Sequence, residues 1–161
     1  MAWFKRQDDR PALPHLQDDP EDAPARLALR VADTVRLVNK QAGQLPTVAV
    51  VKARVLTDTL RQIVETSAVR ELDVYAVLSL RGTLDDYLPT TLRRYLAVPE
   101  EQRNVPRAGG VTPTSSLLDQ LDALQNAASL VLTASQNQDV DALMTQGSFL
   151  ATKFSRSDLD L

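Results

Sequence analysis

The stretch Thr47–Val64, with the sequence TVAVVKARVLTDTLRQIV, decides the fold class of this chain. Its apolar residues recur at intervals of three or four positions: Ala49, Ala53, Leu56, Leu60 and Ile63. Because this is the spacing of one face of an α-helix, the stretch predicts a helix that begins at Pro46–Thr47. Additional valines widen the apolar face: Val48, Val51, Val55 and Val64. We therefore expect this helix to be buried on more than one side.

The helical spacing continues on both sides of this stretch. Upstream, it predicts a helix over residues 25–42 that ends at Gly43. Downstream, it predicts a helix over residues 69–80 that is interrupted at Gly82. Thr83 then suits the N-cap of a restarted helix.

The second half of the chain follows the same pattern. Leucines recur every four residues after the interruption: Leu84, Leu88, Leu92 and Leu96. Pro89 lies inside this run and either kinks the helix or is the first residue of a new one. Residues 98–112 are expected to form the longest internal loop. A helix starting at Thr112–Thr114, a turn at Gln136–Gln138 and a last helix capped by Asp139 complete the chain.

These segments predict an all-α protein, an antiparallel helical bundle of four to six helices. Aromatic residues make up only 4% of the 161 residues, which argues against an all-β fold. We expect three parts: a flexible, acidic, proline-rich arm over residues 1–24, a bundle domain over residues 25–155 and a polar tail over residues 156–161.

The composition excludes several kinds of active site. The chain has no cysteine and one histidine, His15, which lies in the acidic arm, where we expect it to be solvated. Thiolate sites, His-rich metal sites and the Glu-x-x-His motif of carboxylate metal bundles are therefore ruled out. Gly109-Gly110 precedes a helix without the lysine of a phosphate-binding loop. We expect no metal and no cofactor, and we interpret Ser115-Ser116 as helix-capping residues.

Charge is distributed unevenly along the chain. Residues 25–97 carry eleven basic and seven acidic side chains, whereas residues 98–161 carry four basic and eight acidic ones. We expect these segments to neutralise each other within one bundle, with head-to-tail self-association of unlike faces as the alternative. The pI of about 5.1 is far below that of typical nucleic-acid-binding domains, so we expect no nucleic-acid partner.

The tip of the arm, Trp3-Phe4-Lys5-Arg6, places the only tryptophan beside a phenylalanine and two cations. Three surfaces could cover these rings: the chain's own domain, a groove on a partner protein, or lipid headgroups. No apolar run approaches the roughly 20 residues that a membrane-spanning helix needs, and Met1–Arg10 lacks the apolar core of a secretory signal. We expect a cytoplasmic protein, with peripheral contact to the inner face of the membrane as the alternative.

A second group of aromatic residues surrounds Pro89. Tyr87 and Tyr95 flank it eight residues apart, so on a continuous helix they would lie roughly on one face. Either both rings pack at the rim of the bundle with their hydroxyls in water, or they form a patch that binds a protein partner. Together with the tip Trp3–Arg6, the residues Tyr87, Pro89 and Tyr95 are the candidate partner-binding residues.

The run Tyr87–Leu92, YLPTTL, followed by Tyr95-Leu96 and Pro99, resembles a segment of XpaC-like proteins. These form the 5-bromo-4-chloroindolyl phosphate hydrolysis family and often neighbour toxic-anion (tellurite) resistance proteins. The chain also resembles uncharacterised helical proteins of actinobacteria, in which a similar run precedes a Leu-Leu-Asp-Gln-Leu helix (here Leu117–Leu121) and a Phe-Leu-x-x-x-Phe ending (here Phe149–Phe154). The membrane hairpin of XpaC-like proteins and residues that could hydrolyse a phosphate ester are missing, so the resemblance implies an association with envelope or anion stress without an activity.

These observations predict a non-enzymatic adaptor or scaffold module that binds a protein partner. A peripheral membrane protein anchored through residues 3–6 is the first alternative. A hydrolase is the second, and it requires four aspartates to converge in one pocket: Asp85, Asp86, Asp119 and Asp122.

Overall fold

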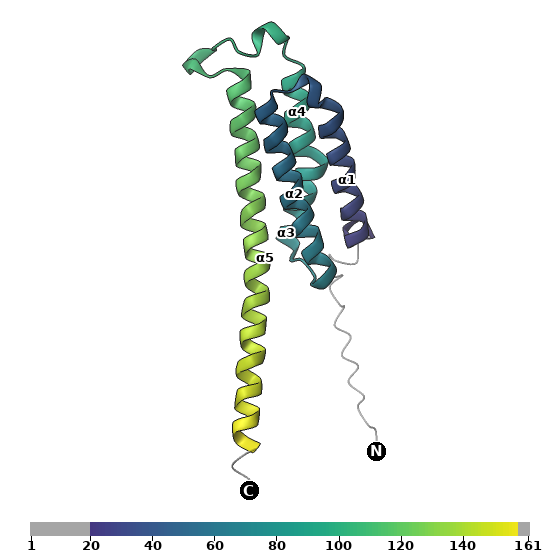
Figure 1. Ribbon diagram of the computed structural model, residues 1–161, viewed down its shortest axis with the longest axis vertical. Coiled ribbons are helices and arrows are strands. Elements are labelled where there is room, and N and C mark those ends of the chain that lie inside the picture. The colour runs from purple at the N-terminus through teal and green to yellow at the C-terminus, as the bar shows by residue number, and fades with distance from the viewer. Residues whose placement is uncertain (1–19, 158–161) are drawn as a thin grey trace, which may run out of the picture.

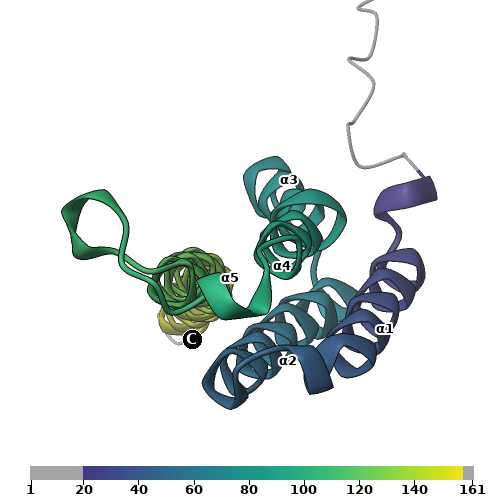
Figure 2. The ribbon, with the colours of Figure 1, turned by 90° about the horizontal axis from the view of Figure 1, so that it is seen from above.

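The all-α prediction is confirmed. The computed structural model describes residues 20–157, together with the side chains of residues 20–138, and no strand occurs in this part of the chain. Its long helices are α1 (Pro24–Gln41), α2 (Thr47–Val69), α3 (Val74–Gly82), α4 (Leu88–Leu96) and α5 (Pro113–Ser157). Figure 1 shows α1, α2 and the α3–α4 segment side by side with the first half of α5, and Figure 2 shows the same helices from above.

The core lies between these helices and takes apolar side chains from each of them. The largest fully buried side chains are Leu27, Val38, Leu56, Leu60, Ile63, Leu80, Leu88, Leu92 and Leu121. Burying one such side chain contributes about 1.5–3 kcal/mol. The apolar face predicted within Thr47–Val64 is confirmed, because all the residues that define it are buried. Val48, Val51 and Val55 are instead about half exposed, since α2 is covered by α1 and α5 and not all around.

The first helix begins and ends within one residue of its predicted bounds, and the short 3-10 turn η3 (Ala42–Gln44) leads from it to α2. A second 3-10 turn, η2 (Pro20–Asp22), precedes α1 and lies within the segment predicted as the arm. Two ion pairs hold η2 in place: Glu21 lies 2.6 Å from Arg30, and Asp22 lies 3.1 Å from Arg81.

The helix expected to start near Val69 starts later. α2 itself continues to Val69, and residues 70–73 connect it to α3. The carboxylate of Asp73 accepts a hydrogen bond from the backbone N–H of Ala76 at 2.8 Å and thereby caps α3. The capping hydrogen bond of Asp73 therefore determines where α3 begins.

The predicted interruption at Gly82 is wrong. Gly82 has helical angles, φ −56° and ψ −41°, and a π-helical turn, η4 (Thr83–Tyr87), joins α3 directly to α4. In this turn the N–H of Leu88 donates to the carbonyl of Thr83, five residues earlier. Pro89 has no N–H, and in an α-helix its ring would crowd the carbonyl four residues earlier. The wider turn relieves this crowding, so α3, η4 and α4 form one continuous helix.

Residues 97–112 connect α4 to α5 and include two short 3-10 turns, η5 (Glu100–Gln102) and η6 (Ala108–Gly110). Gly109 and Gly110 have φ values of 83° and 76°, in the left-handed region that favours glycine. The start of α5 is as predicted. The Oγ1 atom of Thr112 accepts from the N–H of Ser115 at 3.0 Å, and the Oγ atom of Ser115 accepts from the N–H of Thr112 at 3.0 Å.

The helix α5 is continuous, and the predicted turn at Gln136–Gln138 with a new cap at Asp139 is wrong. These residues include neither glycine nor proline, and the backbone stays helical to Ser157. The 45 residues of α5 span about 68 Å at 1.5 Å per residue. The amide of Gln138 lies 3.5 Å from Asp73, level with the α2–α3 connection, and Figure 1 shows the remaining turns of α5 continuing past the other helices.

Candidate functional site

One side of the α3–η4 segment exposes three large side chains. Tyr75 is 77% exposed, Leu78 is 62% exposed and Tyr87 is 56% exposed. Positions 75, 78 and 82 are separated by three and four residues, so they lie on the same side of the helix. We call the surface formed by Tyr75, Leu78 and Tyr87 the α3 face.

Gly82 allows Tyr87 to belong to this face. The backbone hydrogen bonds of a π-turn join residues five positions apart, so such residues are neighbours along the helix. Tyr87 follows Gly82 by five positions and therefore lies beside it. A Cβ atom added at Gly82 would lie 3.0 Å from Cε2 of Tyr87, so the ring covers the position where a larger side chain would stand. The α3 face therefore continues from α3 into η4.

The opposite side of the same helix is fixed in the core. Leu80, Leu84 and Leu88 are buried, and Asp85 forms an ion pair with Arg30 of α1. The exposed side chains are thus carried on a backbone that packing already holds in place. Such a surface loses less conformational freedom on binding than a loop does. In addition, tyrosine is enriched at protein interfaces. The α3 face is therefore suited to contact with another protein.

Tyr95 does not belong to the α3 face. It is 6% exposed, its hydroxyl lies 3.1 Å from Oγ1 of Thr114 in α5, and the guanidinium of Arg103 lies 5.0 Å from the centre of its ring. Eight residues on an α-helix leave about 80° between two side chains around the axis. The prediction that Tyr87 and Tyr95 share a face is therefore wrong, and of the two only Tyr87 is available to a partner.

Arg103 holds the α4–α5 connection against the end of the other helices. Its Nε atom donates to the carbonyl of Val98 at 3.0 Å, and its Nη1 atom donates to the carbonyl of Gln44 at 3.1 Å. The carbonyl of Arg103 accepts a hydrogen bond from Oγ1 of Thr114 at 3.0 Å. Hydrogen bonds from a charged donor are the stronger ones in proteins, so Arg103 and Tyr95 together stabilise this end of the fold.

The other candidate residues fall in different places. Pro89 is partly buried in the first turn of α4. Trp3, Phe4, Lys5 and Arg6 lie outside the described residues, so their contacts stay predictions.

The sequence interpretation missed Tyr75 and Leu78 as site residues. Both lie in the uninterrupted apolar run Val74–Leu78, within the stretch whose spacing predicts only a helix. Five consecutive residues on a helix point in all directions, so they cannot all face one core. That run was the available signal that some apolar side chains in this segment are exposed.

The structure does not bring the four aspartates together. Asp85 pairs with Arg30 of α1, whereas Asp122 on α5 pairs with Lys52 of α2. The hydrogen bonds that Arg30 donates to Asp85 first and then to Glu21 raise the pKa of Arg30 above its ordinary value, so the guanidinium is a permanent cation between two carboxylates. Among the described residues, no three His, Cys, Asp or Glu side chains gather as a metal ion would require.

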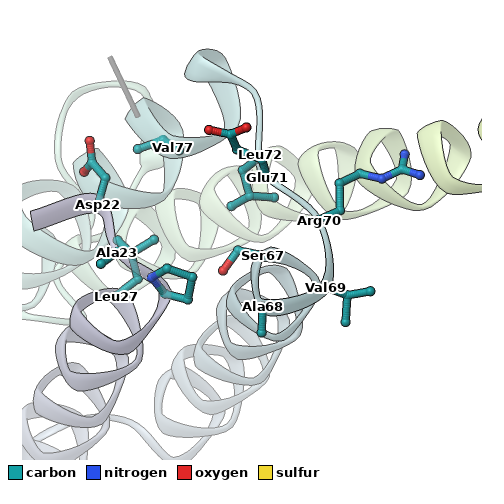
Figure 3. Close-up of a pocket in the computed structure, with 11 residues that line it drawn as sticks. Asp22, Ala23, Leu27, Ser67, Ala68, Val69, Arg70, Glu71, Leu72 and Val77 are labelled. Carbon is teal, nitrogen blue, oxygen red and sulfur yellow. The ribbon is translucent and has the colours of Figure 1, made fainter. Parts of the chain in front are cut away.

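A cavity of about 300 Å³ lies where α1 begins and α2 ends (Figure 3). Two of its polar side chains are already engaged: Asp22 pairs with Arg81, and the Ser67 hydroxyl donates to a carbonyl of its own helix. Figure 3 shows the Arg70 side chain directed away from the cavity. Residues 20–138 contain neither histidine nor cysteine, so no Ser–His or Cys–His pair is present in this cavity.

Comparisons with protein-family models, with curated proteins and with solved structures gave no match. Within the part of the chain that the structure describes, no helix has both the length and the apolar character needed to cross a membrane.

Proposed function

We propose that this protein is a non-enzymatic adaptor or scaffold that binds a protein partner through the α3 face. The observation that carries the proposal is the exposure of Tyr75, Leu78 and Tyr87 by more than half on one side of a continuous helix. Each tyrosine offers a large apolar ring together with a hydroxyl that can bond to a partner. A partner helix with an apolar stripe is the chemistry that fits such a face.

The arrangement we propose for the module is an antiparallel helical bundle. In Figure 1 the chain passes along α1, back along α2, along α3–α4 and back along α5. The connections of residues 42–46 and 70–73 are short, which favours antiparallel neighbours. The α3 face then lies on the outside of the bundle, where a partner can reach it.

The setting we propose is the cytoplasm, in an envelope- or anion-stress system. The similarity of the run Tyr87–Leu92 to XpaC-like proteins supports this setting, and Tyr87 of that run lies on the α3 face.

The test is affinity purification of the full chain from cells of its source organism, comparing the wild type with Leu78→Glu. A charge in the middle of the α3 face should reduce recovery of specific partners at least tenfold. Leu130→Glu is the matched control, because Leu130 is 73% exposed and lies on a different helix, α5. Circular dichroism and urea unfolding should show that both variants remain folded.

Equal recovery of the same partners with Leu78→Glu and with the wild type would overturn the proposal. Loss of recovery with both glutamate variants would also count against it, since the effect would then not depend on the α3 face.

A further inference from the structure

A second apolar surface, separate from the α3 face, lies between α1 and α2. It is a groove with a volume of about 590 Å³. Its apolar lining consists of Pro24, Ala25, Ala28, Val31, Ala32, Val35, Val64 and Ala68. Charged residues at its rim are Arg36, Arg61 and Glu65. The groove therefore suits an apolar occupant with a charge at one end.

The shape of the groove comes from small side chains above a buried floor. Val31 and Val64 are buried beneath it, whereas Ala28 and Ala32 are exposed along its α1 wall. Larger residues at these alanine positions would fill the space. The volume falls in the range of roughly 300–1,000 Å³ that holds sizeable apolar groups in proteins. Aromatic rings are the groups with the most apolar area to bury in such a space.

We propose that the tip Trp3-Phe4 of the same chain occupies this groove. The described residues begin at Pro20, and the groove begins at Pro24, four residues further on. An extended chain from Trp3 to Pro20 can span up to about 56 Å at roughly 3.3 Å per residue. The α1 wall from Pro24 to Arg36 is only about 18 Å long at 1.5 Å per residue. The tip can therefore reach any part of the groove.

The first described residues are fixed just before α1, where Pro24 and Ala25 form one end of the groove. The ion pairs Glu21–Arg30 and Asp22–Arg81 hold η2, so the segment leaves the fold from a defined position. Because residues 5–19 tether the tip to the fold, the effective concentration of the tip at the groove is in the millimolar range of short tethers. A second copy of the chain would have to compete with that concentration, which favours the chain's own tip as the occupant.

The charges at the rim complement the tip. Arg36 pairs with Asp33, and Arg61 lies 2.8 Å from Asp58, so both arginines are already engaged. In the part of the chain that the structure describes, Glu65 has no cation within ion-pair distance. Lys5 and Arg6 directly follow Phe4 and would bring cations to Glu65 when the rings enter the groove.

Trp3 is the only tryptophan, so the fluorescence of the unlabelled full chain tests the proposal. In the wild type, the emission should be blue-shifted and protected from acrylamide quenching. Ala32→Glu places a charge in the groove at an exposed position, and it should shift the emission to the red and raise the quenching constant several-fold. Ala28→Glu should act in the same way. Ala123→Glu is the control, because Ala123 is exposed on α5 away from the groove, and it should leave both readings unchanged.

Each other outcome overturns the proposal. Emission and quenching of the wild type equal to those of the urea-unfolded chain would show that Trp3 does not dock. An unchanged signal in both Ala32→Glu and Ala28→Glu would place Trp3 on another surface. A signal that depends on protein concentration over a hundredfold range would mean that Trp3 enters the groove of a second copy.

Discussion

Tyr87 and Tyr95 lie on one continuous helix and have opposite environments. Tyr95 is packed between Thr114 and Arg103, whereas Tyr87 lies over Gly82 and is largely exposed. The difference comes from the neighbouring elements, because α5 and the α4–α5 connection cover one side of α4. The same residue type therefore stabilises the fold at one position and is available to a partner at the other.

The largest expected effect is that of Tyr95→Ala. Removing a buried aromatic side chain creates a cavity and should lower the free energy of unfolding by about 3–5 kcal/mol. Tyr95→Phe removes only the hydrogen bond to Thr114 and should cost about 0.5–1.5 kcal/mol. Urea unfolding followed by circular dichroism measures both values. Equal costs for the two variants would contradict the packing described for Tyr95.

The next effect concerns the residue that covers Tyr95. Arg103→Met removes the charged hydrogen bonds to the carbonyls of Val98 and Gln44 and should lower the free energy of unfolding by roughly 1.5–3 kcal/mol. Arg107→Met is the matched control, because Arg107 is exposed in the same connection, and its effect should stay within about 0.5 kcal/mol. If the two variants unfold at the same urea concentration, Arg103 does not hold the connection.

A smaller effect is expected at Gly82, beside Tyr87. Alanine is favoured over glycine within a helix by roughly 0.5–1 kcal/mol, but the new Cβ would lie 3.0 Å from the Tyr87 ring. Because Tyr87 is exposed, the ring can move, so Gly82→Ala should change the free energy of unfolding by less than about 1 kcal/mol. In NMR spectra the ring signals of Tyr87 should shift while those of Tyr95 stay in place. A shift of both sets would mean that the whole helix moves.

The sequence allowed the helix faces to be predicted, but not which helices continue. Apolar spacing placed α1 and α2 correctly because each buries one face against neighbours. The same spacing contains a sign of the π-turn: Leu80, Leu84, Leu88 and Leu92 recur at strict intervals of four and are all buried. In a regular α-helix, side chains spaced four residues apart rotate gradually around the helix axis. The wider π-turn reverses this rotation, so the four leucines stay on one side.

The error in α5 has a different origin. The polar run Gln136–Gln138 suggested a turn, but these residues are simply exposed on a helix that continues. A polar run shows that a segment is exposed to water, and it does not by itself indicate a break, since α5 continues through this one. The exposure of Tyr75 and Leu78 depends on where α5 packs against α3 and where α1 packs against η4, which local periodicity does not determine.

The smallest effect on stability is expected for Tyr87→Ala, and it is the change that separates the two tyrosines most clearly. The side chain is 56% exposed, so its removal should alter the free energy of unfolding by no more than about 0.5 kcal/mol. If the α3 face binds a partner, the same change should weaken that binding at least tenfold, which corresponds to about 1.4 kcal/mol. Tyr95→Phe should show the reverse, with a measurable loss of stability and unchanged binding. Weaker binding by Tyr95→Phe together with unchanged binding by Tyr87→Ala would move the interaction surface to the other side of the helix.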